Sequence, residues 1–230
     1  MPESLAFAFP DPHNLSPNPR PEIDVSAVLL PRPVAPLDWR DVFQNDHPVE
    51  LEVGSGKGLF LASEALANPA RNYLGIEIAR KYARKCAERL VKHAVPNARV
   101  ISDDAKRLIR ECIADSSLDA IHVYFPDPWW KKRHKKRRVF SHEFVAAAAR
   151  VLKPGGRLAI ATDVEEYFLV MTALVGENPA WQRLDDALDA QPGAGPRTNF
   201  ERKYQIEGRP IYSAAFRFLG LIQPAPASRH

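Results

Sequence analysis

The sequence predicts an α/β fold, a doubly wound and mostly parallel sheet with helices on both faces and a C-terminal antiparallel strand pair. Short β-type runs alternate with helical patterns five times along the chain, which is typical of such a sheet. β-branched and aromatic residues around Ile211 to Phe218 then close the chain as the expected antiparallel pair. A length of 230 residues is enough for one large domain.

The first expected strand is Val49 to Val53, followed by a glycine turn and an apolar helix from Leu59 to Leu66. The second strand, Tyr73 to Ile76, leads into a long helix. Its buried face is predicted from residues that recur every fourth position and their neighbours, namely Ile78, Tyr82, Cys86 and Leu90 with Ala83, Ala87 and Val91. This spacing makes Cys86 a core residue.

The third strand is expected near Arg99 to Ile101, before a helix whose apolar stripe consists of Leu108, Ile109, Cys112 and Ile113. The fourth strand, Ala120 to Phe125, is stopped by Pro126 and Pro128. Ser141 is expected to cap the next helix, with Glu143 in its first turn.

A turn at Lys153 to Gly156 is expected to end that helix, and Leu158 to Ala161 then forms the fifth strand. A helix from about Glu165 to Val175 and a Pro/Gly loop near Gln191 to Pro196 complete the order before the terminal pair.

The amino-terminal segment is unusually rich in proline, with ten of the 21 prolines in the first 48 residues. Proline removes a backbone donor and biases the preceding residue toward extended conformations. We therefore expect a proline-rich extended or disordered arm over residues 1–35 and a single domain over residues 36–230.

Composition places the chain among globular proteins, with 45% hydrophobic and 26% charged residues. These values argue against wholesale disorder, a collagen or a disulfide scaffold. The two cysteines both fall on helical apolar faces, which favours a reducing compartment. There is no apolar run of about 18 residues and no charged start of a signal peptide, so we expect a cytoplasmic protein without a membrane span.

The positive charge is concentrated in one place. The formal net charge is +4, yet the segment 131–138 (KKRHKKRR) carries seven positive residues, so the rest of the chain has a net charge of −3. A local basic patch on a mildly acidic body is the distribution expected where a polyanion docks.

Candidate functional residues follow the expected strands, because open α/β sheets bind ligands outside the carboxyl ends of their strands. Acidic residues stand at four successive ends, and a further polar pair follows the fifth: Glu52 before the turn Gly54 to Gly58, Glu77, Asp103-Asp104, Asp127, and Thr162-Asp163. Four acids at four strand ends are hard to explain as chance loop residues, although any one of them alone could be a solvated loop residue.

The glycine turn has the spacing G-x-G-x-G at Gly54, Gly56 and Gly58, whereas the dinucleotide fingerprint requires G-x-G-x-x-G. Glu52 before the turn would repel a diphosphate and attract a cation, so the turn favours S-adenosylmethionine, which carries an ammonium and a sulfonium. Glu77 lies about 20 residues later, where an acid can accept both hydroxyls of a ribose, and Asp104 is placed to accept from an adenine amino group.

Asp127 lies between two prolines that limit the ordering entropy lost when it meets a substrate. Trp129 and Trp130 supply faces for base stacking, although core packing is expected for one of them. The basic run follows directly, so phosphate binding is favoured over a solvated helix end or a localisation signal.

The sequence resembles the bacterial tRNA (guanine-N7)-methyltransferases. The segment Pro126 to Arg138 is similar to the signature of that family, and Thr198-Asn199-Phe200-Glu201 is similar to its carboxy-terminal T-x-F-E motif. With the E-x-G-x-G-x-G turn, which alone would indicate only a class I methyltransferase, the resemblance spans roughly residues 49–218. The arm before residue 35 matches nothing in the family pattern.

The resemblance implies a Rossmann-like fold and methyl transfer from S-adenosylmethionine to N7 of guanine 46 in the tRNA variable loop. Carried over to this sequence, the cofactor residues would be Glu52, Gly54, Gly56, Glu77, Asp104 and Asp127, with Asp127 also the catalytic residue. Substrate would contact Lys131, Asp163, Thr198, Asn199, Phe200 and Glu201, and RNA would contact Arg133, His134, Lys135, Lys136, Arg137 and Arg138.

Three alternatives remain open. Asp127-Pro128-Trp129 is also related to the Asp/Asn-Pro-Pro-aromatic motif of amino-group methyltransferases, although the second proline is missing. A nicotinamide oxidoreductase is disfavoured by the glycine spacing, and a non-catalytic tRNA-binding protein would bind RNA without turnover. Histidines and cysteines show no ligand spacing, so no metal site is expected, and the sequence does not distinguish a monomer from a homodimer.

Overall fold

The structure is a computed structural model that describes residues 22–129, 133, 138–184, 198, 201, 203 and 206–220. Its strands are β1 (Leu29–Leu30), β2 (Val49–Val53), β3 (Asn72–Ile76), β4 (Ala98–Ile101), β5 (Leu118–Tyr124), β6 (Leu152–Thr162), β7 (Trp181–Leu184) and β8 (Tyr212–Phe218). Its helices are α1 (Trp39–Phe43), α2 (Leu59–Ala67), α3 (Arg80–Lys92), α4 (Ala105–Cys112), α5 (His142–Val151) and α6 (Glu165–Gly176).

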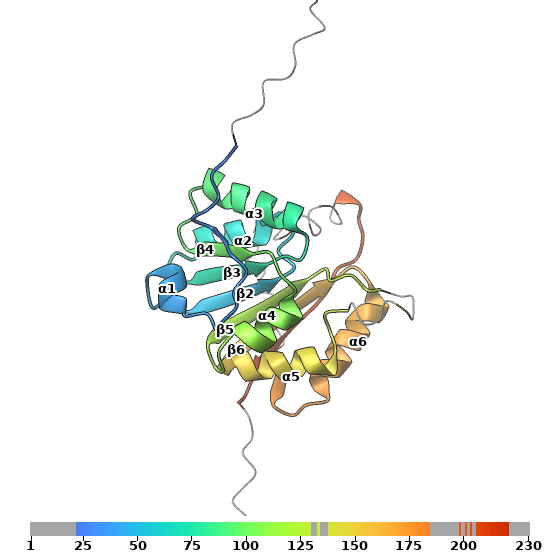
Figure 1. Cartoon of the computed structure of the whole chain (residues 1–230). Helices are drawn as coiled ribbons and strands as arrows, with labels where there is room; N and C mark the ends of the chain where they lie inside the picture. The colour runs from blue at the N-terminus through green and yellow to red at the C-terminus, as the bar shows by residue number, and fades with distance from the viewer. Residues whose placement is uncertain are drawn as a thin grey trace, which may run out of the picture.

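The strands form one sheet in the order β1-β4-β3-β2-β5-β6-β8-β7 (Figure 1). All pairs from β1 to β6 are parallel, whereas β8 runs antiparallel to both β6 and β7. The predicted doubly wound sheet with a C-terminal antiparallel strand pair is confirmed.

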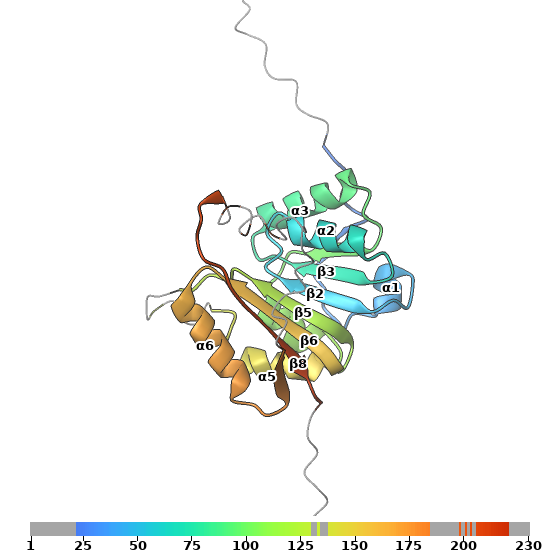
Figure 2. The same ribbon diagram turned by 180° about the vertical axis from the view of Figure 1, so that it is seen from behind.

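Helices cover both faces of this sheet because side chains alternate along each strand (Figures 1 and 2). On one face, Leu51 of β2 packs in a cluster with the apolar sides of α4, α5 and α6. On the other face, Tyr73 of β3 and Val100 of β4 pack with α2 and α3. The sheet therefore stands between two apolar layers, and its carboxyl edge is left to the loops.

Helix starts follow the capping residues of the sequence. The Ser141 hydroxyl accepts a hydrogen bond from the Phe144 amide at the start of α5, which confirms the predicted cap. The Asp38 and Asp104 carboxylates cap α1 and α4 in the same way, through the amides two residues further on.

The predicted turn before the fifth strand lies inside that strand in the structure. Leu152 already pairs with Leu118 of β5, so the expected turn at Lys153 to Gly156 is an irregularity inside β6, where the register shifts and Gly155 has a φ of 85°. The turn residues can be recognised from the local sequence. The pairing of Leu152 cannot, because it depends on β5, which is distant in the sequence.

The buried face of α3 is narrower than predicted. Ala83, Cys86, Ala87 and Leu90 are buried as expected, whereas Ile78, Tyr82 and Val91 are exposed. The helix begins only at Arg80, so Ile78 lies before it, and an every-fourth-residue row drifts off a face with 3.6 residues per turn.

Part of the predicted arm belongs to the fold. Residues 1–21 lie outside the described residues, but Val25 and Val28 are buried and Leu29–Leu30 pair with β4. The folded part of the chain therefore begins before the expected boundary at residue 35. The apolar residues that cover the sheet edge at β4 lie in a short stretch between prolines: Val25, Val28, Leu29 and Leu30.

Cys86 and Cys112 are both free and buried, in agreement with their predicted core positions. Within the described residues, no helix combines the length and the apolar character that crossing a membrane requires.

Candidate functional site

Four predicted acids follow four neighbouring parallel strands. The residues Ile101, Ile76, Val53 and Val123 are aligned across β4, β3, β2 and β5, so these strands end at one edge of the sheet. Asp104, Glu77, Glu52 and Asp127 belong to these four strand ends. The topology therefore brings the acids to the same edge, as expected from the sequence.

The glycine turn after β2 is anchored to the end of β3. The backbone amides of Gly54 and Ser55 donate hydrogen bonds to the carbonyl oxygen of Ile76, at 2.8 and 3.0 Å. Gly54, Gly56 and Gly58 have φ angles of 84°, 52° and 71°, a region that residues with a Cβ rarely adopt. Glycine at these alternate positions lets the chain turn from β2 into α2.

One side of this turn is open and the other is packed. A Cβ at Gly54 or Gly56 would meet no heavy atom within 4 Å, whereas a Cβ at Gly58 would overlap the thiol of Cys86 in α3. A ligand can thus approach the backbone at Gly54 and Gly56, while Gly58 seats the start of α2 against α3.

Glu77 links the turn to the next strand end. This residue is 8% exposed, and its carboxylate accepts the amides of Gly56 at 2.9 Å and Ala79 at 2.8 Å, one on each oxygen. A carboxylate oxygen has more than one lone pair, so Glu77 retains acceptor capacity for a hydroxyl-bearing ligand.

Glu52 is the most deeply placed of the four acids, at 4% exposed. Its Oε2 atom has no hydrogen-bond partner among the described residues. Burial, together with the charges of Glu77 and Glu64, raises the pKa of Glu52 well above its ordinary value of 4.5, although a hydrogen bond with the Leu61 backbone opposes this. A cationic group beside Glu52 would stabilise its ionised form.

The neighbouring acids after β4 have different surroundings. Asp104 is exposed and accepts the Lys106 amide at 2.8 Å as the cap of α4. Asp103 is buried in ion pairs with Arg32 and Arg107. Burial acts to raise the pKa of Asp103, but the hydrogen bond from Arg107, the Asp104 amide and the nearby charges hold it below its usual range. Asp103 is therefore a structural anchor, and Asp104 is the accessible acid at this strand end.

The segment after β5 carries the exposed Asp127 on an unusual backbone. Phe125 and Trp129 on either side have positive φ angles of 52° and 40°. Such conformations in bulky residues are uncommon and cluster at functional sites, where the surrounding structure maintains them.

Contacts to the protein body hold this segment in place. The Phe125 amide donates to the Ala161 carbonyl at 2.7 Å, and Arg138 Nε donates to the Pro128 carbonyl at 2.6 Å. The Arg138 guanidinium also lies 5.2 Å from the centre of the Tyr167 ring in α6. Arg138, expected to contact RNA, thus has a clear contact within the protein.

The remaining predicted substrate and RNA residues are only partly described. Trp130, Lys131, His134, Lys135, Lys136, Arg137, Asn199 and Phe200 lie outside the described residues, and Arg133 is exposed. Asp163 follows β6 and forms an ion pair with Arg209 at 2.5 Å. Thr198 is buried, and its hydroxyl accepts the Glu201 amide at 2.9 Å.

The sequence analysis did not identify a set of buried polar side chains that are linked by hydrogen bonds. His122 Nε2 lies 2.7 Å from Glu50 Oε2, and His122 Nδ1 lies 3.0 Å from the Tyr124 hydroxyl. Arg71 donates to the other Glu50 oxygen at 2.8 Å. The sequence could have indicated this pair, because Glu50 and His122 both lie inside predicted strands, where a sheet covered on both faces buries every side chain. Within the described ranges, no group of histidine, cysteine and acidic residues could hold a metal ion.

Comparison with known proteins gives one matching family model, "Putative methyltransferase", over residues 46–214. The chain is 42% identical over 217 residues to a tRNA (guanine-N(7)-)-methyltransferase of Rhodopirellula baltica, covering 86% of this chain and 77% of that protein. It is 37% identical over 188 residues to the protein of the same name from Bordetella pertussis, covering 82% and 74%.

Among solved structures, the fold is similar to that of the 16S rRNA methyltransferase KamB. The TM-score is 0.60 at 18% identity, and the match covers 79% of this chain and 92% of that one. At this level of identity the likeness extends to the fold alone.

Proposed function

Because the chain belongs to the tRNA (guanine-N(7)-)-methyltransferase family, we propose that it transfers a methyl group from S-adenosylmethionine to N7 of the variable-loop guanine, nucleotide 46, of tRNA. The observation that carries the proposal is the pairing of a buried, incompletely hydrogen-bonded Glu52 with an open glycine turn at the edge where Asp127 lies.

The residues present fit S-adenosylmethionine. The spare oxygen of Glu52 suits an ammonium group, and the accessible backbone at Gly54 and Gly56 suits close approach of the ligand. Glu77 would accept ribose hydroxyls, and the exposed Asp104 would accept an adenine amino group. Bound there, S-adenosylmethionine supplies an electrophilic methyl group.

The chain itself has little proton chemistry to perform. Guanine N7 is a neutral ring nitrogen with a free lone pair, so no general base is required. Asp127 would orient the donor edge of guanine or the cofactor and stabilise the positive charge that develops on the base. Proton abstraction by Asp127 is the weaker hypothesis.

Further substrate contacts are proposed for residues that follow Asp127 in the sequence. Lys131, Asp163 and the motif Thr198-Asn199-Phe200-Glu201 would contact the substrate, and the basic run from Arg133 to Arg138 would contact RNA phosphates. The ion pair of Asp163 with Arg209 and the capping bond of Thr198 support defined positions for these two residues. The cytoplasm, where tRNA is processed in bacteria, is the proposed location.

The test is to incubate the purified chain with labelled S-adenosylmethionine and unmodified tRNA, digest the RNA with nuclease, and identify the methylated nucleoside by mass spectrometry. We expect 7-methylguanosine at nucleotide 46 and no product from a tRNA with adenine at that position. Methylation of an exocyclic amine would instead support the amino-group alternative, and RNA binding without any product would support the non-catalytic one.

A further inference from the structure

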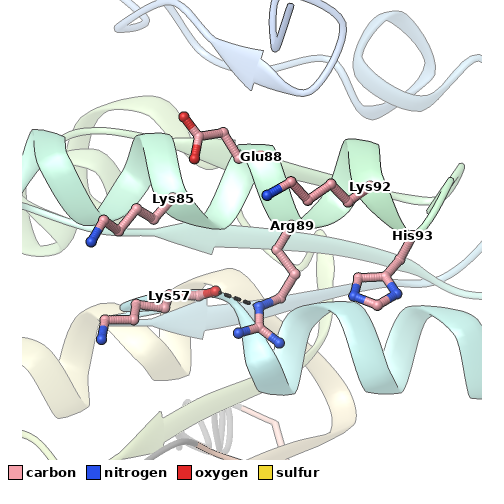
Figure 3. A pocket seen from close by; sticks show the side chains of 6 residues that line it. All are labelled: Lys57, Lys85, Glu88, Arg89, Lys92 and His93. Carbon is pink, nitrogen blue, oxygen red and sulfur yellow. Dashed lines mark hydrogen bonds between the residues drawn. The ribbon is translucent and has the colours of Figure 1, made fainter. Parts of the chain in front are cut away.

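A hollow on the surface of α3 lies beside the glycine turn and is mostly basic (Figure 3). Its lining residues are Lys57 from the turn, Lys85, Glu88, Arg89 and Lys92 from α3, and His93 directly after the helix. The mechanism proposed above uses none of these side chains.

The charge of the hollow is not neutralised from within. Four of its residues are cationic and only Glu88 is anionic. The Glu88 carboxylate forms an ion pair with Arg84 at 3.3 Å, and it points away from Lys57 and Arg89 in Figure 3. The side chains of Lys57, Lys85 and Lys92 are thus left to present positive charge to an external anion.

One row of α3 carries only positive charges. Lys81, Lys85 and Arg89 follow one another at intervals of four residues, which places like charges on neighbouring turns. Such pairs destabilise a helix. A bound polyanion would remove this repulsion, which solvent exposure alone does only in part.

A hydrogen bond connects the hollow to the glycine turn that is proposed to bind the cofactor. Arg89 Nε donates a hydrogen bond to the Lys57 carbonyl oxygen at 2.9 Å (Figure 3). Lys57 stands between Gly56 and Gly58, so the basic surface begins at the turn and continues along α3. Lys92 lies seven positions after Lys85, about 10 Å along the helix axis, and this span suits neighbouring backbone phosphates better than one small anion.

We propose that the hollow of Lys57, Lys85, Arg89 and Lys92 binds backbone phosphates of the tRNA substrate at a distance from the methylated nucleotide. This inference rests on the proposed function and adds a second anchor, separate from the basic run 131–138. Phosphate contacts of this kind position the RNA without reading its sequence. The tRNA would then be held at α3 in addition to its contacts near the methylated nucleotide.

The experiment uses the double variant Lys85→Gln and Lys92→Gln, which keeps both side chains long and leaves Arg89 and the glycine turn intact. We expect the Kd for tRNA, measured by equilibrium binding, to rise roughly tenfold, while kcat and the affinity for S-adenosylmethionine stay unchanged. The slope of log affinity against log salt concentration should fall by about 0.7–0.9 per lost contact. The matched control, Arg183→Gln with Arg217→Gln, removes the same charge from exposed positions on β7 and β8 and should change neither quantity.

A variant that is expected to strengthen tRNA binding shows that the weaker binding of the double variant does not result from unfolding. Glu88→Gln removes the anion of the hollow and should tighten tRNA binding about twofold, with a melting temperature like that of the wild type. Equal tRNA affinity and equal salt slopes in wild type, double variant and Glu88→Gln would overturn the inference. Failure of the proposed function is seen separately, as absence of methylation by the wild-type protein, because RNA binding is measured without turnover.

Discussion

The Glu77 carboxylate and the Gly56 amide, 2.9 Å apart, join the end of β3 to the glycine turn after β2. The other carboxylate oxygen holds the amide of Ala79, just before α3. One side chain therefore fixes the relative positions of two loops at the carboxyl edge while keeping lone pairs for a ligand. The proposed ribose contact and the loop geometry depend on the same charge.

Glu77→Gln tests this double role. We expect the affinity for S-adenosylmethionine to fall about tenfold in titration calorimetry, because the amide replaces a charged acceptor by a neutral one. Glu166→Gln, an exposed acid in the first turn of α6, is the control and should bind like the wild type. Equal affinities in all three proteins would remove Glu77 from the cofactor site.

Glu52→Gln should stabilise the free protein at neutral pH. A raised pKa in the folded state means that the stability contributed by this group is complete below about pH 4.5 and is lost as pH rises through the folded-state pKa. The glutamine variant avoids that loss, so its advantage in chemical denaturation should be near zero at pH 4.5 and grow with pH to roughly 1–3 kcal/mol. The same variant should bind S-adenosylmethionine weakly.

Glu50→Gln provides the comparison with opposite sign. Burial acts to raise the pKa of Glu50, but His122 and Arg71 outweigh it and leave the pKa below its ordinary value. Glu50 therefore stabilises the fold above its unfolded pKa, and this stability disappears as pH falls through the folded one. Its replacement should cost about 1–3 kcal/mol at neutral pH, since glutamine loses the charged hydrogen bonds that the buried carboxylate makes with His122 and the half-exposed Arg71. A similar pH profile for both variants would contradict the assigned environments.

The strand predictions succeeded for the short β-type runs of the central parallel strands, whose residues are almost all buried. Val49–Val53 was predicted with its observed bounds, and the strand ends that carry Glu77 and Asp127 were placed to within a residue. Acids directly after such runs are readable without a structure, because parallel strands share one carboxyl edge.

What escaped prediction depends on partners far away in the sequence. β7 contains the polar pair Gln182 and Arg183 and forms because β8 offers it a ladder, and β1 is two residues long. The burial of Asp103 was not predicted, since it depends on tertiary contacts with Arg32 and Arg107. The Glu50–His122 pair likewise joins residues 72 positions apart.

Gly58→Ala should destabilise the fold more than Gly54→Ala. Both positions have positive φ, which costs a residue with a Cβ about 1–2 kcal/mol. Only at Gly58 does the added methyl group also overlap Cys86, which adds roughly 1–3 kcal/mol of overpacking. Denaturant unfolding of the two variants measures the difference.

A double-mutant cycle isolates the contact. Cys86→Ala removes the thiol, so combining it with Gly58→Ala should cost less than the sum of the two single changes by about 1 kcal/mol or more. Strict additivity would mean that backbone strain alone explains the effect at Gly58.

Arg138→Lys distinguishes a positioning role from an RNA contact. If the guanidinium holds the Pro128 carbonyl and the Tyr167 ring, lysine keeps the charge but loses the geometry. We expect kcat to fall about tenfold while the salt dependence of tRNA binding stays unchanged, because Asp127 is displaced. A normal kcat in Arg138→Lys, combined with weaker RNA binding in Arg138→Gln, would leave Arg138 with the RNA contact alone and exclude the positioning role.

Asp127→Asn and Asp127→Ala test the chemistry. Asp127 is exposed, so both variants should keep the melting temperature of the wild type, while kcat falls about 100- to 1,000-fold because the developing positive charge loses its partner. Since guanine N7 carries no proton to remove, kcat of the wild type should be flat between about pH 6 and 9. A pH–rate profile with a basic limb that disappears in Asp127→Asn would instead make Asp127 a proton acceptor, and wild-type rates in both variants would exclude it from the mechanism.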